Sequence, residues 1–134
     1  MKVRNMIQGP YVYFGIIDIL DEHRDYSKFR SDESFEDKLN EHHCVSVPDD
    51  IINNWWEKLL TMKSYYHEYS RLSTALARWG ITLIPPESLD LFHDIIISDT
   101  SSEFFEKGTD DVNNLLALVE KAKKENKFVI HYGV

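Results

Sequence analysis

The fold expected from this sequence depends mainly on the stretch RWGITLIPPESLDLFHDIII, residues 78–97. Gly80 lacks a Cβ and can therefore adopt the left-handed conformation that ends a helix. Pro85 excludes the α conformation for Ile84, whereas Pro86 suits the first position of a new helix. The stretch therefore predicts a helix that ends at Gly80, a second helix that begins at Pro86, and a buried apolar connector between them.

Apolar residues recur at helical spacing on both sides of this connector. The helix that follows it presents Leu89, Phe92 and Ile96 on one face and extends to about Ile97. The helix that precedes it carries a stripe of Leu72, Ala75, Leu76 and Trp79. We therefore expect the two helices to pack around the connector, with Trp79 mostly buried.

Two segments upstream carry signals for a helix N-terminus. Ser34 and Asp37 resemble a capping box, which starts a short helix. Pro48 opens a longer helix with a broad apolar stripe. This stripe consists of Ile51, Ile52, Trp55, Trp56, Leu59 and Leu60. We expect Trp55 or Trp56 to be buried in the core.

The patterns near the two ends of the chain leave alternatives open. Residues 11–20 form a helix or a buried strand, and the adjacent Ile16 and Ile17 favour the helix because they break strict alternation. Thr109 is a good N-cap for a long helix with a lysine-rich last turn. Residues 128–132 are β-branched and aromatic, which predicts a short terminal strand or an extended tail.

These patterns predict a mainly α fold. We expect a single compact helical domain over residues 1–134, with about five or six helices and short strands only at the C-terminus. The chain has 134 residues, of which 43% are hydrophobic, so it is long enough to bury a core. It lacks an apolar run of about 18 residues and a secretion signal, so a cytoplasmic location is expected.

The net charge of −8 is concentrated in two segments. Residues 18–50 hold eleven acids and four bases, and residues 85–111 hold eight acids and one base, so each segment carries −7. Direct nucleic-acid binding is not expected, because phosphate contacts need clustered Lys and Arg. The acids favour a basic protein partner, with solubility alone as the simpler explanation.

The sequence contains no recognisable catalytic or metal-binding motif. The segment of His42, His43 and Cys44 does not predict a metal site, because adjacent side chains point to different sides. We expect it to be a solvated loop. No phosphate-binding glycine loop, Gly-x-Ser-x-Gly turn or His-Glu-x-x-His motif occurs. We expect a protein that is not an enzyme and that has no cofactor.

Candidate partner-binding residues are of two kinds. The acidic candidates lie on segments that read as exposed, and they are Asp32, Glu33, Glu36, Asp37, Asp99, Glu103 and Glu106. The aromatic candidates are Tyr65, Tyr66 and Tyr69. Tyrosines anchor protein interfaces, but they are equally common as half-buried core residues, and the sequence leaves both readings open.

Three motifs together resemble a family of small bacterial immunity proteins. These motifs are WWEK at 55–58, ARWGITLIPPESL at 77–89 and KAKKENKFVIHYG at 121–133. Members of the family neutralise the toxin domains of contact-dependent growth inhibition and related polymorphic toxin systems. The resemblance spans roughly residues 50–134 and leaves the N-terminal segment uncovered.

The resemblance implies a cytosolic inhibitor that binds one cognate toxin domain and covers its active site. Such toxins are often nucleases, and EndoU-type ribonucleases are the first candidates. The acidic charge agrees with this reading, because a nuclease surface is basic where RNA binds. The alternative is a small helical enzyme or ligand-binding protein with a site near Trp55, Trp79 and His93.

Overall fold

A six-stranded antiparallel sheet forms the centre of the molecule, in the order β2-β1-β6-β5-β3-β4. The computed structural model describes residues 11–28, 31–98 and 109–133. The strands are β1 (Tyr11–Ile17), β2 (Val45–Pro48), β3 (Lys63–Tyr66), β4 (Leu72–Thr74), β5 (Gly80–Ile84) and β6 (Phe128–Gly133). The C-terminal strand β6 therefore lies in the middle of the sheet, between β1 and β5.

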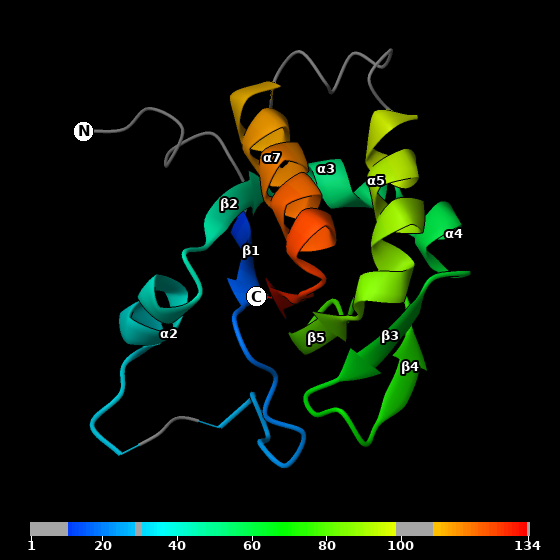
Figure 1. Cartoon of the computed structure of the whole chain (residues 1–134). Helices are drawn as coiled ribbons and strands as arrows, with labels where there is room; N and C mark the ends of the chain where they lie inside the picture. Colours follow the sequence, from blue (N-terminus) through cyan, green and yellow to red (C-terminus); the bar gives the residue numbers. More distant parts are fainter. Residues whose placement is uncertain (1–10, 29–30, 99–108, 134) are drawn as a thin grey trace, which may run out of the picture.

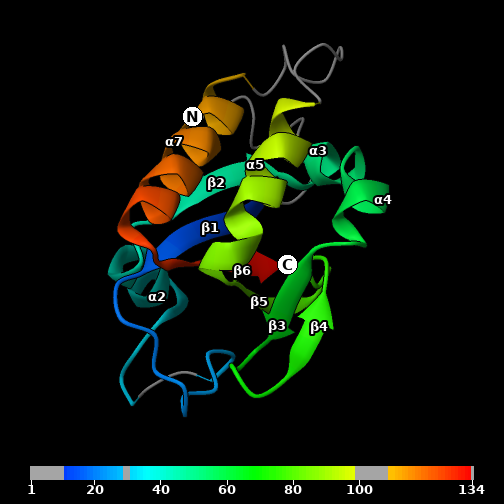
Figure 2. The ribbon, with the colours of Figure 1, turned by 45° about the vertical axis from the view of Figure 1, so that its right-hand side comes forward.

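The helices cover both faces of this sheet (Figure 1). They are α2 (Phe35–Glu41), α3 (Asp49–Asn53), α4 (Trp56–Leu59), the 3₁₀ turn η1 (Pro86–Ser88), α5 (Leu89–Ile97) and α7 (Thr109–Glu125). Figure 2 shows α5 and α7 side by side across one face, and we call α3, α4, α5 and α7 the helical layer. Among the described residues, no helix has the length and apolar character needed to span a membrane.

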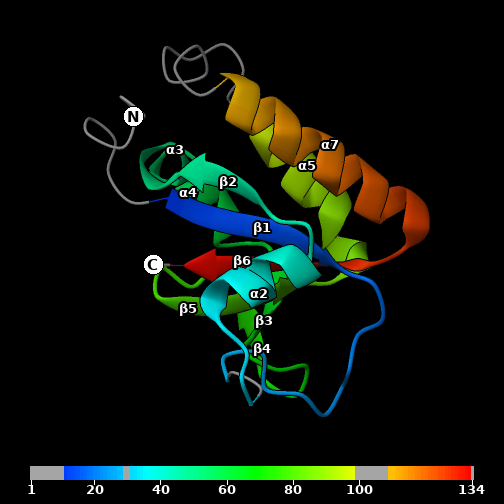
Figure 3. The same cartoon turned by 90° about the vertical axis from the view of Figure 1, so that its left-hand side faces the viewer.

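The opposite face of the sheet is covered by α2 and the chain that leads to it. Figure 3 shows α2 lying across the sheet on the side away from α5 and α7. Residues 18–28 and 31–34 run beside it, and we call these residues together with α2 the α2 layer. Tyr26 and Leu39 of this layer pack on Ile130 and Tyr132 of β6.

The expectation of a mainly α fold was wrong, and the connector at 81–84 shows the reason. It is strand β5, with Ile81 and Leu83 facing the α2 layer and Ile84 facing the helical layer. A strand that is covered on both faces reads as a continuous apolar run instead of an alternating one. Periodicity alone does not distinguish such a run from a buried helix or connector.

The same error affected the first described segment. The helix expected over 11–20 is strand β1 over Tyr11–Ile17. Val12 and Phe14 of β1 pack in the helical-layer core, whereas Ile17 packs with the α2 layer. The strand is therefore buried on both faces, and the adjacent Ile16 and Ile17 did not indicate a helix.

The helix expected over Leu72 to Gly80 is also absent. Residues 63–74 form the hairpin of β3 and β4, and the chain then turns back into β5. Gly80 does adopt a left-handed conformation, with φ at +107°, but it begins a strand instead of ending a helix. A Cβ at this position would lie 2.6 Å from Nε2 of His67, so the His67 ring would have to shift to accommodate a larger residue.

Several local predictions were correct. The Ser34–Asp37 capping box is present at the start of α2. Pro85 follows β5 and Pro86 begins η1, and α5 then buries Leu89, Phe92 and Ile96 as expected. The helix expected after Pro48 is divided into α3 and α4, and residues 128–133 form a strand as one of the two readings proposed.

Candidate functional site

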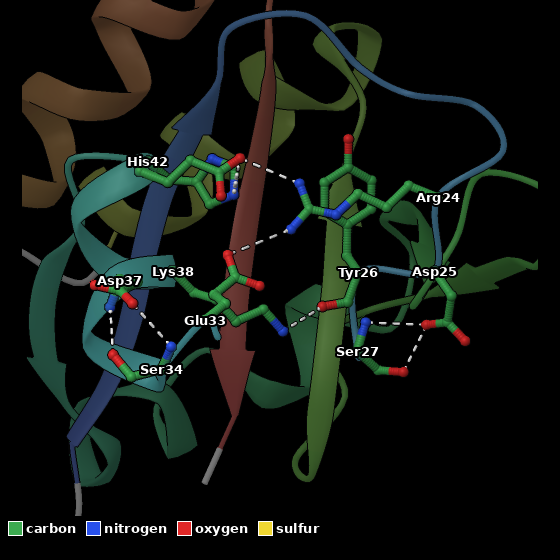
Figure 4. Close-up of polar contacts among 10 residues, drawn as sticks. Arg24, Asp25, Tyr26, Ser27, Glu33, Ser34, Asp37, Lys38 and His42 are labelled. Carbon is green, nitrogen blue, oxygen red and sulfur yellow. Dashed lines mark hydrogen bonds and ion pairs between the residues drawn. The ribbon is translucent and has the colours of Figure 1, made fainter. Parts of the chain in front are cut away.

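The α2 layer contains a charged contact that joins its two parts. The Arg24 guanidinium lies 3.1 Å from Glu41 at the end of α2 and 4.0 Å from Glu33 ahead of α2. The same guanidinium lies over the Tyr26 ring, 4.5 Å from its centroid. Figure 4 shows this arrangement, which we call the Arg24 clamp.

Lys38 provides a second connection beneath the clamp. Its side chain is buried, and its ammonium group donates a hydrogen bond of 2.7 Å to the carbonyl oxygen of Tyr26 (Figure 4). Burial lowers the pKa of Lys38, with smaller opposing effects from nearby carboxylates such as Glu33. Because the charge is held inside by specific partners, this contact orients α2 relative to residues 18–28.

The predicted acidic residues of this layer divide into two groups. Glu33 has a side chain only 9% exposed and belongs to the clamp, so its reading as an exposed acid was wrong. Asp37 accepts the Ser34 amide at 2.9 Å as part of the helix cap, so it already has a structural role. Asp32 and Glu36 are exposed, as predicted.

Asp32 and Glu36 have no ion-pair partner in the part of the chain that the structure describes. Asp32 lies in a turn with φ at +66°, a conformation that Asp tolerates better than most residues. Glu22 is another exposed acid of this layer, and it too forms no ion pair with a described residue. The remaining acidic candidates, Asp99, Glu103 and Glu106, lie outside the described residues.

The three candidate tyrosines do not form a single surface. Tyr65 is 8% exposed and belongs to the core on the α2 side. Tyr69 is 36% exposed, with its ring centroid 4.8 Å from that of Tyr65 and 5.8 Å from that of Phe128. Tyr66 points elsewhere and stacks on His67, with centroids 3.8 Å apart.

The Tyr69 hydroxyl is influenced both by a neighbouring tyrosine and by carboxylates. The neighbouring Tyr65 raises the pKa of the Tyr69 hydroxyl, and the carboxylates of Glu22 and Glu87 contribute further to this rise. Leu72 pairs with Tyr65 across the hairpin and is also exposed. The α2 side of the molecule thus presents an exposed tyrosine and leucine with carboxylates close by, and tyrosine is enriched at protein interfaces.

The segment His42, His43 and Cys44 lacks the properties of a catalytic site. His42 is buried against the rings of Tyr26 and Tyr132, so the expectation of a solvated loop was wrong for this residue. Burial raises the pKa of the Cys44 thiol to about 12, so the thiol is protonated at neutral pH and a poor nucleophile. No group of His, Cys, Asp and Glu within the described ranges is arranged to hold a metal ion.

The three residues proposed for the alternative site occupy different environments. Trp55 lies in the core with its ring 6.4 Å from Phe92. His93 faces α7, where its Nε2 lies 3.2 Å from a carboxylate oxygen of Glu120. Trp79 lies on the turn between β4 and β5 and is 71% exposed, so the prediction that it is buried was wrong.

Comparison of the chain with protein-family models, with curated proteins and with solved structures finds no significant match. The arrangement of side chains therefore carries the functional argument. Sequence reasoning missed Arg24, Glu22 and the exposure of Trp79. The −7 charge of residues 18–50 indicated Glu22 only as one of eleven acids.

Proposed function

We propose that this protein is an immunity protein. It binds a cognate bacterial toxin domain in the cytoplasm and neutralises it by covering its active site. The toxin is a nuclease with a basic surface, and an EndoU-type ribonuclease is the first candidate. The resemblance of three sequence motifs to such immunity proteins and the net charge of −8 both support this proposal.

The observation that carries the proposal is the surface of the α2 layer. Its exposed acids Glu22, Asp32 and Glu36 form no ion pair with the described residues, and we propose that they face the basic surface of the partner. The Arg24 clamp and the buried Lys38 connect the segments that bear these acids. Partner-binding charges held on an ordered scaffold lose less conformational freedom on binding than charges on a loose loop.

The proposed mechanism is occlusion of an RNA-binding surface. Carboxylates on the inhibitor take the place of RNA phosphates against Lys and Arg of the toxin, and charge attraction accelerates association. Charge attraction alone raises the association rate more than it raises the affinity for the toxin domain, so an apolar contact is also needed. Tyr69 and Leu72, which are exposed beside Tyr65, provide such a contact on the α2 side.

A co-purification and protection experiment tests the proposal. A candidate EndoU-type toxin domain is mixed with the wild-type chain, and RNA cleavage is measured with and without the inhibitor. We expect a stable complex and loss of cleavage. The variant Glu36→Lys is expected to associate more slowly, whereas Glu57→Lys, which makes the same charge change at an exposed acid on α4, serves as the matched control.

The alternative of a small enzyme or ligand-binding protein gains less support. Its three residues lie in the core, against α7 and on an exposed turn, so they do not surround a common ligand. Failure of the chain to bind or neutralise any domain of the candidate toxin classes would reject the immunity proposal.

A further inference from the structure

Trp79 differs from the other two tryptophans of the chain. Trp55 is 1% exposed and packs on Phe92, and Trp56 is half-buried with the Arg78 guanidinium 4.9 Å from its ring centroid. Trp79 is 71% exposed, and within the described residues its ring makes no aromatic or cation contact. An isolated exposed tryptophan leaves a large apolar and aromatic surface in water.

The backbone that carries Trp79 is held from both sides. Its carbonyl oxygen accepts a hydrogen bond of 3.4 Å from the Tyr66 hydroxyl, and Gly80 follows it with φ at +107°. Arg78 precedes it and is anchored to Asp49 at 3.3 Å and to Asn53 at 2.6 Å. The turn is therefore fixed while the side chain stands in solvent.

The close fit of the neighbouring strand also restrains this turn. A Cβ on Gly133 at the end of β6 would lie 2.6 Å from the carbonyl oxygen of Arg78. Only glycine allows the two backbones to approach so closely at this point. A side chain presented from such a turn binds a partner with little loss of backbone freedom, which is the condition for a strong anchor residue.

The chemistry of the expected partner follows from the other aromatic rings and from the charge. In the described part of the chain, three other rings carry a guanidinium within 5 Å of their centroids: Tyr26 with Arg24, Tyr66 with Arg71, and Trp56 with Arg78. Trp79 offers the same kind of ring face with no cation from the described residues on it, and indole is the strongest of the aromatic acceptors. A net charge of −8 attracts basic proteins and disfavours association with a second copy of this chain.

We infer that Trp79 is an anchor residue of the partner interface and that its ring receives an arginine or lysine side chain of a basic protein. The inference rests on the proposed function, because the basic protein is the toxin domain proposed above. It adds a second contact point, on the β4–β5 turn, to the acidic surface of the α2 layer. Tryptophan is among the residues most enriched at positions that dominate binding energy.

The test uses the whole chain labelled with 5-fluorotryptophan, whose three ¹⁹F signals are assigned with the variant Trp79→Phe. The chain is titrated with a catalytically inactivated EndoU-type toxin domain and, separately, with a deca-arginine peptide. We expect the Trp79 signal to shift in both titrations while the Trp55 signal stays in place. We also expect Trp79→Ala to raise the Kd for the toxin domain about tenfold or more.

The control variant is Leu91→Ala, which truncates an exposed apolar residue on α5 and is expected to bind like the wild type. If the toxin domain binds and is neutralised while Trp79→Ala and the Trp79 signal show no effect, the inference fails and the proposed function stands. If no toxin domain binds, the proposed function fails, and an unmoved Trp79 signal in the peptide titration then rejects the inference as well. If the Trp79 signal shifts only when the concentration of the inhibitor chain itself is raised, a second copy of the chain occupies the ring. That result also overturns the inference.

Discussion

The two faces of the sheet are held by different kinds of contact. Against the helical layer, the contacts are almost entirely apolar, from Phe14 and Trp55 to Phe92 and Leu115. Against the α2 layer, apolar packing is supplemented by a buried ammonium group and a shared guanidinium. The first face is suited to stabilise the fold, because burial of apolar surface contributes a large free energy and does not depend on the orientation of the groups.

The second face is suited to fix the orientation of its surface. Contacts of Lys38 and Arg24 are directional, so they hold α2 and residues 18–28 in one relative arrangement. Their net contribution to stability is modest because desolvation opposes the charge attraction. The exposed acids proposed to bind a partner lie on this layer, which suggests a division between a stabilising face and a binding face.

The largest effect is expected from truncating the helical-layer core. Trp55→Ala removes a buried ring that packs on Phe92, and such changes cost about 3–5 kcal/mol of unfolding free energy. Trp79→Ala is the matched control and should change the free energy of unfolding by less than about 0.5 kcal/mol, because its ring is exposed. Urea denaturation measures both, and equal losses would contradict the assignment of the two tryptophans.

One buried histidine is a polar residue within the largely apolar core on the helical-layer side. His131 lies on β6 with its ring 4.9 Å from that of Phe14, and neither ring nitrogen has a hydrogen-bond partner among the described residues. Burial lowers the pKa of His131 to about 3, whereas the unfolded chain has the ordinary value of 6.5. The unfolded state therefore binds more protons between these pH values, and stability falls as pH decreases through this window.

The expected loss is about 2 kcal/mol between pH 7 and pH 5, since one proton is worth about 1.4 kcal/mol per pH unit below the unfolded pKa. Urea midpoints at several pH values measure it. The variant His131→Phe should lack this component of the pH dependence and should be at least as stable at pH 7, because no polar nitrogen is then buried without a partner. Identical pH profiles for the two proteins would contradict the burial of a neutral imidazole.

A smaller effect is expected from breaking the Arg24 clamp. Arg24→Ala removes the guanidinium that contacts Glu33 and Glu41, and it should cost about 1–2 kcal/mol, between the values for exposed and buried ion pairs. Hydrogen exchange should increase mainly in residues 18–28 and 35–41, with little change in α7. Arg78→Ala, which removes a more exposed pair with Asp49, is the control. A uniform increase in exchange across both layers would show that the clamp does not act locally.

The sequence predicted local termini better than it predicted the sheet. Ser34 and Pro86 act through neighbours within four residues, so their effects were visible in the sequence. The placement of β5 between β6 and β3 depends on pairing with residues far along the chain, such as Leu83 with Ile130. Once a run is buried on both faces, its composition no longer tells a strand from a buried helix.

The candidate site was predictable to a similar degree. The charge of residues 18–50 correctly indicated an acidic surface, and Asp32 and Glu36 are exposed. Nothing in the sequence distinguished Glu33 from Glu36, because the difference depends on Arg24 folding back over α2. Trp79 was misplaced because its spacing matched a helical stripe in a segment that forms a strand and a turn.

The smallest effect on stability, and the most informative about binding, is expected at the adjacent acids of α2. Asp37→Ala removes the capping-box bond that the Asp37 carboxylate accepts from the Ser34 amide and should cost about 0.5–1.5 kcal/mol of unfolding free energy, while the Asp37 amide still donates to Ser34 Oγ. Glu36→Gln changes an exposed side chain with no ion pair among the described residues and places no positive charge in the first turn of α2, so its effect on unfolding should stay within about 0.5 kcal/mol. The two neighbours thus separate a structural acid from a candidate binding acid.

The order should be reversed for binding, because Glu36 is one of the exposed acids proposed to contact the basic partner, whereas Asp37 is part of the helix cap. Glu36→Lys is expected to lower the association rate constant for the proposed toxin domain several-fold at low salt, with the difference shrinking as salt screens the charge. Glu57→Lys makes the same charge change on α4 and should lower that rate less, because it lies away from the α2 layer. Stopped-flow association at several salt concentrations measures the difference, and equal rates for the two variants would mean that the α2 acids contribute only to the net charge.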